Sequence, residues 1–200
     1  MLAARFFNRP TLEVARELLG KFLVRRYRGG QLELLISEVE AYDGPDDRAS
    51  HANRGLTPRT QVMFGPAGIF YVYFTYGMHW LLNVVTGPSG YPAAVLLRGG
   101  MVPDSGRGRV SVSGPARLTK YMHVGPRLNA RRARPATGLW FEDRGVEVTS
   151  RQIVAGKRIG VAYAADWEDR PYNLRLAERA LVRLARKPQL PTQLVTKTSA

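Results

Sequence analysis

Residues 68–83, Gly68-Ile-Phe-Tyr-Val-Tyr-Phe-Thr-Tyr-Gly-Met-His-Trp-Leu-Leu-Asn83, predict the central feature of the fold. Aromatic and β-branched residues on both sides of Gly77 are typical of two strands joined by a tight turn. Alternation along the first strand puts its side chains on two faces: Tyr71, Tyr73 and Thr75 on one, and Phe70, Val72 and Phe74 on the other. Because a buried tyrosine hydroxyl needs a hydrogen-bond partner, we expect the tyrosine face to be aromatic and partly wet.

The segments around this ribbon predict an α+β protein. Strands are expected at 22–27 and 32–42, which pair across a glycine turn, at 92–98, and in short pieces near 139–141, 146–149 and 158–162. Helices are expected at 11–19, 116–122 and 173–186. Since strands outnumber helices and do not alternate with them, we predict a single domain over residues 1–187 with a curved, mostly antiparallel β-sheet core and a few flanking helices. Residues 188–200 are predicted to be a flexible tail.

Composition excludes several classes of protein. The 200 residues, 44% of them hydrophobic, fit one soluble globular domain. No apolar run approaches the roughly 20 residues that a membrane helix needs, and the N-terminus has no signal-peptide pattern. The chain has no cysteine and only three histidines, at 51, 79 and 123. We therefore expect a cytoplasmic protein with no membrane span, no disulfide, no metal centre and no cofactor.

The charge indicates a polyanionic partner. Thirty Lys and Arg residues against sixteen Asp and Glu residues give a net charge of +14 and a pI near 10.7. A globular domain this basic is typical of proteins that bind nucleic acid, because neutralising phosphates releases their counterions. The alternative is a proteome with a general bias toward arginine.

Glu40 is the first candidate for chemistry. It follows the apolar run 34–36 and lies between Val39 and Ala41. A carboxylate in such a position is partly desolvated unless it faces a cleft or a cation, and carboxylates of this kind serve as general bases. Glu38 lies on the same face of the strand, so the sequence leaves open which of the two acts. A salt-bridged strand end is an equally good interpretation.

Four further residues are candidates for a binding pocket. Tyr42 and His51 flank an Asp-rich turn and together can wall a pocket for a planar ligand, although a lone histidine in a polar loop is more often a surface residue. Asn83 lies inside an apolar strand, where its amide must bond either backbone or a ligand. Arg98 closes another apolar strand and needs an anionic partner, either Glu40 or a phosphate.

Tyr76 lies at the expected tip of the ribbon, beside Gly77. An exposed, rigid aromatic ring on a hairpin of a basic protein can wedge between stacked bases and take the place of one of them. An ordinary tyrosine at a hairpin end is the alternative. Tyr71 has no assigned task and is consistent with a place in the core.

These residues, with their neighbours, keep the order and spacing of a known family: Glu40-Ala-Tyr42, Gly44-Pro45, Asp47, Ala49, His51, Thr57, Arg59, Met63-Phe64, Gly68, Tyr71-Val-Tyr73, Tyr76-Gly-Met78 and Asn83. The chain resembles the single-domain alkyladenine (3-methyladenine) DNA glycosylases, base-excision repair enzymes without a helix-hairpin-helix. The resemblance is dense from about residue 18 to residue 98. It continues more thinly through Ser113-Gly-Pro115 and Arg158-Ile-Gly-Val161.

The resemblance implies an activity and a role for each candidate residue. The activity is that of a monofunctional DNA N-glycosylase that removes alkylated or deaminated purines, such as 3-methyladenine, 7-methylguanine, hypoxanthine and ethenoadenine. It acts on double-stranded DNA, as a monomer, without a metal and without a covalent lysine intermediate. The implied roles are a general base that activates water (Glu40), a group that positions the water or the nucleotide (Arg98), an enclosure for the flipped base (Tyr42, His51, Tyr73), a filter against guanine (Asn83) and a wedge in the duplex (Tyr76).

The chemistry of damaged purines agrees with these roles. A purine alkylated at N3 or N7 is cationic, so its glycosidic bond is already weak. Tyrosine faces attract such a base through cation–π stacking, which a neutral normal base lacks. The enzyme then needs chiefly a positioned water and a carboxylate.

The chain departs from the family pattern in two places. Val39 stands before the Glu-Ala-Tyr motif, where the family usually has threonine. An aromatic-rich closing segment is replaced by Asp166-Trp-Glu-Asp-Arg-Pro-Tyr-Asn173. The resemblance also implies a backbone contact to the pocket from Val161 or its neighbours.

Two other functions fit the basic composition. A non-catalytic protein that binds lesion-containing DNA would have the pocket without turnover, although such a protein would be free to lose Glu40 and Arg98, which are both present. A basic RNA-associated domain is the third hypothesis, and the sequence offers no motif for it.

Overall fold

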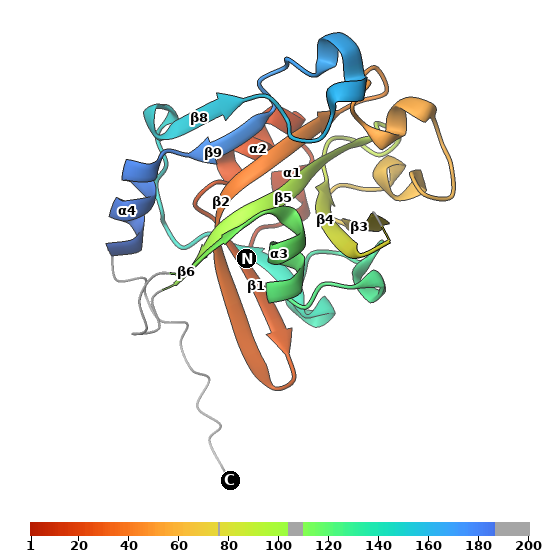
Figure 1. Ribbon diagram of the computed structural model, residues 1–200. Helices are drawn as coiled ribbons and strands as arrows, with labels where there is room; N and C mark the ends of the chain where they lie inside the picture. Colours follow the sequence, from red (N-terminus) through yellow and green to blue (C-terminus); the bar gives the residue numbers. More distant parts are fainter. Residues whose placement is uncertain (76, 104–109, 187–200) are drawn as a thin grey trace.

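The computed structural model describes residues 1–75, 77–103 and 110–186, which form a single α+β domain on an open sheet of nine strands (Figure 1). Six strands follow the order β3-β4-β5-β2-β1-β7, while β6 pairs with β5 and β9 pairs with both β2 and β8. Every pairing between these strands is antiparallel. The predicted fold class and the single domain are therefore confirmed. The predicted tail, 188–200, lies outside the described residues.

The elements follow one another closely along the chain. The strands are β1 (Phe22–Tyr27), β2 (Gly30–Asp43), β3 (Phe70–Thr75), β4 (His79–Val85), β5 (Ala93–Val102), β6 (Val110–Ser113), β7 (Leu139–Glu142), β8 (Ile153–Gly156) and β9 (Asn173–Leu176). The α-helices are α1 (Ala4–Phe7), α2 (Thr11–Leu18), α3 (Pro115–Tyr121) and α4 (Glu178–Arg186). The 3-10 helices are η1 (His51–Arg54), η2 (Gln61–Phe64), η3 (Pro126–Leu128), η4 (Pro135–Thr137), η5 (Ser150–Gln152) and η6 (Ala162–Trp167).

Strict alternation along the central strands divides the sheet into two faces. One face is apolar and packs into the main core under α2: Val39, Ala41, Phe70, Val72, Leu82, Val84, Val95 and Leu97. On the other face, cross-strand pairing aligns one row of residues over four neighbouring strands: Tyr71, Asn83, Leu96 and Glu40. The segments with η1, η2 and η6 lie above this second face (Figure 1). The alternation predicted for residues 70–75 is confirmed, and it continues across the sheet.

Two β-bulges interrupt the pairing of β2 with β5. Val39 pairs with Leu97 and Glu38 with Gly99, so Arg98 is an extra residue on β5. Ser37 is in turn an extra residue on β2, between the pairs that Ile36 and Glu38 make. A bulge re-aims the side chain that it carries and increases the local twist of the sheet. The bulge therefore sets the direction of the Arg98 side chain on the sheet.

Three predicted elements differ in the structure. Residues 173–176, predicted to begin the last helix, form β9, because Leu174 and Leu176 are buried and alternate with an exposed Arg175 between β2 and β8. Residues 158–162 are not a strand, because Arg158 and the backbone of Ile159 bond to β2 and the loop after it. Residues 146–149 pack their valines against the core without a strand partner.

Within the described ranges, the helices are all too short or too polar to cross a lipid bilayer.

Gly100 lies where β5 runs close beside β2, so a substitution there measures how tightly the two strands pack. A Cβ atom at this position would lie 2.6 Å from the carbonyl oxygen of Leu35 and would overlap the Leu34 side chain. We expect Gly100→Ala to destabilise the fold by about 1–3 kcal/mol, the usual cost of overpacking a core. Urea denaturation measures this difference. Gly156→Ala is the matched control, since a Cβ there meets no atom within 4 Å. Equal stabilities of the two variants would contradict the close crossing.

Candidate active site

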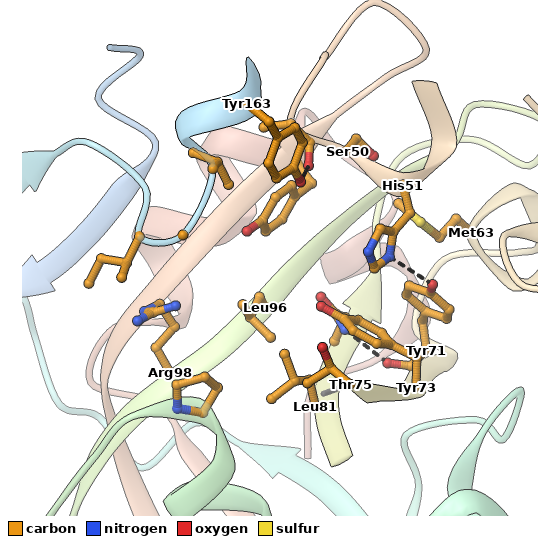
Figure 2. Close-up of a pocket in the computed structure, with 17 residues that line it drawn as sticks. Ser50, His51, Met63, Tyr71, Tyr73, Thr75, Leu81, Leu96, Arg98 and Tyr163 are labelled. Carbon is orange, nitrogen blue, oxygen red and sulfur yellow. Dashed lines mark hydrogen bonds between the residues drawn. The ribbon is translucent and has the colours of Figure 1, made fainter. Parts of the chain in front are cut away.

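A pocket of about 380 Å³ opens on the face of the sheet that carries the tyrosines (Figure 2). Five of the residues singled out by the sequence line it: Tyr42, His51, Tyr73, Asn83 and Arg98. Glu40 has no exposed surface and lies behind this lining. Tyr76 lies outside the described residues. The structure thus brings together six of the seven predicted site residues.

Aromatic rings form one side of the pocket. Figure 2 shows His51, Tyr71 and Tyr73 grouped there, with Arg98 on the opposite side and Leu96 between them. The ring centroids of His51 and Tyr73 are 4.7 Å apart in an edge-to-face arrangement. Tyr71, which had no assigned task, is 2% exposed and also lines the pocket. An aromatic wall of this kind suits a flat, unsaturated ligand.

His51 is held as a neutral imidazole. Its Nδ1 lies 3.1 Å from the Tyr71 hydroxyl. Burial, followed by the positive charges of Arg59 and Arg54, lowers its pKa from 6.5 to about 4. A neutral ring whose Nδ1 accepts the tyrosine proton carries its own proton on Nε2. The hydroxyl of Tyr71 therefore fixes which hydrogen-bonding groups His51 can offer to a ligand.

Glu40 is a fully buried carboxylate whose two oxygens are both hydrogen-bonded. Oε2 accepts from the Tyr42 hydroxyl at 2.9 Å and from Arg98 Nη1 at 3.2 Å. Oε1 accepts from the backbone N–H of Ile159 at 2.8 Å and from Asn173 Nδ2 at 3.1 Å. The salt-bridge interpretation of Glu40 is therefore confirmed, with Arg98 as its partner. A role in chemistry stays compatible with it, because both partners of Oε2 line the pocket.

Arg98 joins the two glutamates of β2. Its Nε donates to Glu38 Oε1 at 3.0 Å, while its Nη1 bonds to Glu40. Asn173 donates to both carboxylates as well, at 3.0 Å for Glu38. Two carboxylates thus share one guanidinium, so the cluster is one negative charge in excess. The bulge at Arg98 lets a single side chain reach both partners.

Tyr42 separates the pocket from a buried ion pair. Arg158 and Asp47 have no exposed side-chain surface and form a bidentate pair, with Nη2 to Oδ1 at 2.8 Å. The Arg158 guanidinium lies between two rings, 4.9 Å from the centroid of Tyr42 and 5.2 Å from that of Tyr172. Burial, with the nearby Glu40 charge next, raises the pKa of Tyr42 well above its usual value, so its hydroxyl stays a donor.

Asn83 lies in the middle of the pocket floor. It is 3% exposed, and its Nδ2 donates to the backbone carbonyl of Tyr71 at 3.1 Å. The amide therefore ties β4 to β3 and at the same time lines the pocket. The backbone-bonding interpretation of Asn83 is therefore confirmed, and a contact with a ligand stays a prediction.

The sequence prediction missed several residues of the site. Asp47 was interpreted as part of a turn and of the family motif, with no partner assigned, and its pairing with Arg158 spans 111 positions of the chain. Asn173 was placed in a helix. The segment around Ile159 was expected to be a strand, but the backbone N–H of Ile159 donates to Glu40 Oε1 instead. The alternation of β9, with Leu174 and Leu176 inward, is the signal that identifies the position of Asn173.

No group of three or more His, Asp or Glu side chains in the described part of the chain is arranged to hold a metal ion.

Together the open sheet and this pocket define an α+β protein with an aromatic-walled site for a planar ligand, backed by a buried carboxylate. Comparison with known proteins identifies the family to which this α+β protein belongs. The chain belongs to the methylpurine-DNA glycosylase family, whose model matches residues 5–180. Membership places it among the DNA glycosylases of base excision repair, which are hydrolases.

Several relatives cover nearly the whole chain and bear the name "Putative 3-methyladenine DNA glycosylase". One from an Anaeromyxobacter species is 44% identical over 181 residues, 90% of this chain and 91% of its own length. One from Methanocella arvoryzae is 44% identical over 183 residues, 86% of this chain and 90% of its own. One from Myxococcus xanthus is 44% identical over 178 residues, 86% of this chain and 88% of its own.

The Arg158–Asp47 pair predicts a large loss of stability when one partner is removed. Arg158→Met leaves an uncompensated buried carboxylate, so we expect a loss of about 3–5 kcal/mol in the free energy of unfolding. The control is Arg48→Met, which breaks the exposed pair with Asp166, for which about 0–1 kcal/mol is expected. Urea denaturation measures both. Similar losses in the two variants would contradict the buried pair.

The environment of His51 predicts its titration. Because folding lowers the pKa of His51, its neutral form stabilises the fold above pH 6.5, and that stability is lost as the pH falls toward 4. NMR titration of the imidazole is expected to show a midpoint of about 4. Tyr71→Phe removes the hydroxyl donor. In this variant we expect the His51 proton to be shared between Nε2 and Nδ1, which the ¹⁵N chemical shifts of the ring report. A midpoint above 6 in the wild type would refute this account.

Proposed function

We propose that this protein is a monofunctional DNA N-glycosylase that hydrolyses the glycosidic bond of alkylated or deaminated purines, the class of 3-methyladenine, 7-methylguanine, hypoxanthine and ethenoadenine. It takes the damaged nucleotide out of the duplex and holds the base in the aromatic pocket. The proposal rests on the family membership and on one geometric observation. Glu40, a buried carboxylate, is bonded through Oε2 to two groups that line the pocket, Tyr42 and Arg98.

Base flipping brings the purine between the pocket walls. Extrusion of a nucleotide costs a few kcal/mol, and least where damage already weakens the base pair. Tyr42 stacks on one face of the base and the His51–Tyr73 pair on the other. Stacking on these rings repays part of the cost of extrusion. The basic surface of the protein holds the phosphates on either side.

Glu40 acts as the general base for the attacking water. The bond from C1′ of the sugar to the base nitrogen breaks, and its electron pair leaves with the base. The water oxygen forms the new bond at C1′, and its proton passes to Glu40 Oε2. Arg98 orients the water and the carboxylate, since its guanidinium already bonds to Oε2 and faces the pocket. The products are a free base and an abasic site.

Asn83 and Tyr76 complete the proposed site. Asn83 occupies the pocket floor and leaves little room for the exocyclic amino group of guanine, so a normal guanine is excluded. Tyr76, which follows β3 and lies outside the described residues, fills the space that the flipped base leaves in the duplex.

The proposed reaction has three consequences. Water is the nucleophile, so the enzyme needs neither a cofactor nor a covalent lysine intermediate and does not cut the strand. One chain carries every proposed group, so a monomer suffices. The substrate is double-stranded DNA, so the protein works in the compartment that holds the chromosome, which in a bacterium is the cytoplasm with its nucleoid.

A non-catalytic protein that binds lesion-containing DNA is the second candidate function. The hydrogen bonds to both oxygens of Glu40 favour it, because no lone pair is left for water until one donor moves. For turnover the Tyr42 side chain has to move away from Oε2, because turning its hydroxyl alone would leave two oxygens 2.9 Å apart without a proton between them. The two functions therefore differ in turnover rather than in binding.

Glu40→Gln tests the proposal. On duplexes with a single hypoxanthine or 3-methyladenine we expect the wild type to release the base, and the variant to be slower by about 100-fold or more, the range of general-base catalysis. Release is measured as strand breaks after hot alkali, with no breaks before alkali. Binding of the same duplex and folding are measured beside release, because Gln keeps the shape of Glu but puts an amide N–H2 where an oxygen now accepts hydrogen bonds.

Glu38→Gln is the matched control. It removes a neighbouring carboxylate that also bonds to Arg98, so a smaller loss than in Glu40→Gln is expected. A larger loss would move the base to Glu38. If the wild type binds the lesion duplex but yields no abasic site, the binding-protein alternative is correct.

A further inference from the structure

One pocket wall has an arginine behind it. The Arg59 guanidinium lies 4.9 Å from the ring centroid of Tyr73. Arg59 does not line the base pocket; it lines the neighbouring hollow, together with Arg48 and Arg54. The cation therefore stacks on Tyr73 from outside the pocket, while the same ring faces the pocket with its other side.

The residues around Arg59 hold its guanidinium in place and are affected by its charge. Arg59 Nη2 lies 3.5 Å from the backbone carbonyl of Phe74, which holds it against β3. Its charge opposes the rise in the pKa of Tyr73 that burial causes. It also contributes to the lowered pKa of His51. It opposes the rise in the pKa of Tyr71 as well. A single guanidinium thus acts on all three rings of this wall.

The opposite wall is electrically different. Tyr42 also carries a guanidinium on its outer side, that of Arg158, but Asp47 neutralises it. For Arg59, the described part of the chain provides no carboxylate within ion-pair distance. Among the described residues, therefore, an uncompensated positive charge lies behind the His51–Tyr73 side of the pocket and not behind the Tyr42 side.

A cation behind a tyrosine changes what the other face attracts. The ring binds cations through the negative potential of its π system, and Arg59 already uses that potential. A positively charged base on the pocket side would also be repelled through the ring, where little water screens the two charges. A neutral purine meets neither penalty.

The bond-breaking step adds to this difference. As the C1′–N bond breaks, the electron pair moves to the base, so a cationic base leaves as a neutral molecule and a neutral base leaves as an anion that is protonated afterwards. In the transition state the first carries a charge between +1 and 0, and the second between 0 and −1. Relative to free enzyme and DNA, Arg59 therefore stabilises only the departure of the neutral base.

We propose that Arg59, stacked on the outer side of Tyr73, is a specificity-determining residue that favours neutral damaged purines, such as hypoxanthine, over cationic ones, such as 7-methylguanine. This inference rests on the proposed glycosylase function. Cationic bases leave readily without help. Arg59 therefore reduces the difference in excision rate between cationic and neutral lesions, and it excludes neither class. Arg59 acts through Tyr73 and does not touch the base.

The test compares two lesions in one reaction. Duplexes of one sequence, with either a hypoxanthine or a 7-methylguanine, compete for the enzyme at pH 8, where His51 is neutral. The ratio of the two kcat/KM values cancels any general loss of DNA affinity. In Arg59→Gln we expect the ratio of 7-methylguanine to hypoxanthine to rise about threefold to tenfold over the wild type, the effect of one cation–π contact.

Arg54→Gln is the matched control. It removes an equal charge from the same hollow, but no contact joins Arg54 to Tyr73 in the described part of the chain. We expect both kcat/KM values to fall together and the ratio to stay within about twofold of the wild type. An unchanged ratio in Arg59→Gln, or an equal rise in both variants, overturns the inference while the glycosylase function stands. Release of neither base by the wild type overturns the glycosylase function itself.

Discussion

The full burial of Glu40 is the constraint on which the arrangement of the site depends. A buried carboxylate is costly unless donors surround it, and here the donors come from four parts of the chain. Tyr42 extends from the same strand, Arg98 from the next one, Ile159 from the loop after β8 and Asn173 from β9. Each of these hydrogen bonds offsets part of the cost of burying the carboxylate. The carboxylate therefore fixes how the loop and β9 dock on the sheet, and the pocket wall that they supply.

The register of the sheet determines which side chains of its strands face the pocket. Antiparallel pairing puts Tyr71, Asn83, Leu96 and Glu40 in one row, so aromatic wall, amide, apolar floor and carboxylate follow one another at strand spacing. A slip of one residue in any pair would turn that strand's contribution into the apolar core. Of the two bulges between β2 and β5, the one at Arg98 lets a single guanidinium reach both glutamates. Strands therefore carry eight of the 17 residues that line the pocket, and loops and short helices carry the other nine.

Local patterns predicted the sheet face well and the long-range contacts poorly. Alternation in residues 70–75 places Tyr73 correctly, and an arginine at the end of an apolar run implies an anionic partner, which is Glu40. Nothing local to Asp47 or Arg158 indicates that they pair, because a contact between distant positions leaves no periodic signal. Residues 173–176 fit a helical pattern equally well until β2 and β8 offer hydrogen bonds on both sides, and then tertiary pairing overrides the periodicity.

The charges around the pocket are arranged along the path that electrons take in the proposed reaction. Glu38, Glu40 and Arg98 leave one negative charge in excess on the side where the sugar and the water would lie. Arg59 leaves one positive charge behind the wall where the base would lie. Tyr73 of that wall lies opposite Arg98 across the pocket (Figure 2). Bond cleavage makes the sugar positive and moves an electron pair to the base, so this fixed field lowers the barrier without reorganising. The same field opposes a base that arrives already positive. One charge arrangement therefore has two effects. It lowers the barrier to cleavage for neutral lesions, whose glycosidic bond is stronger, and it weakens the binding of cationic lesions, whose bond is already weak.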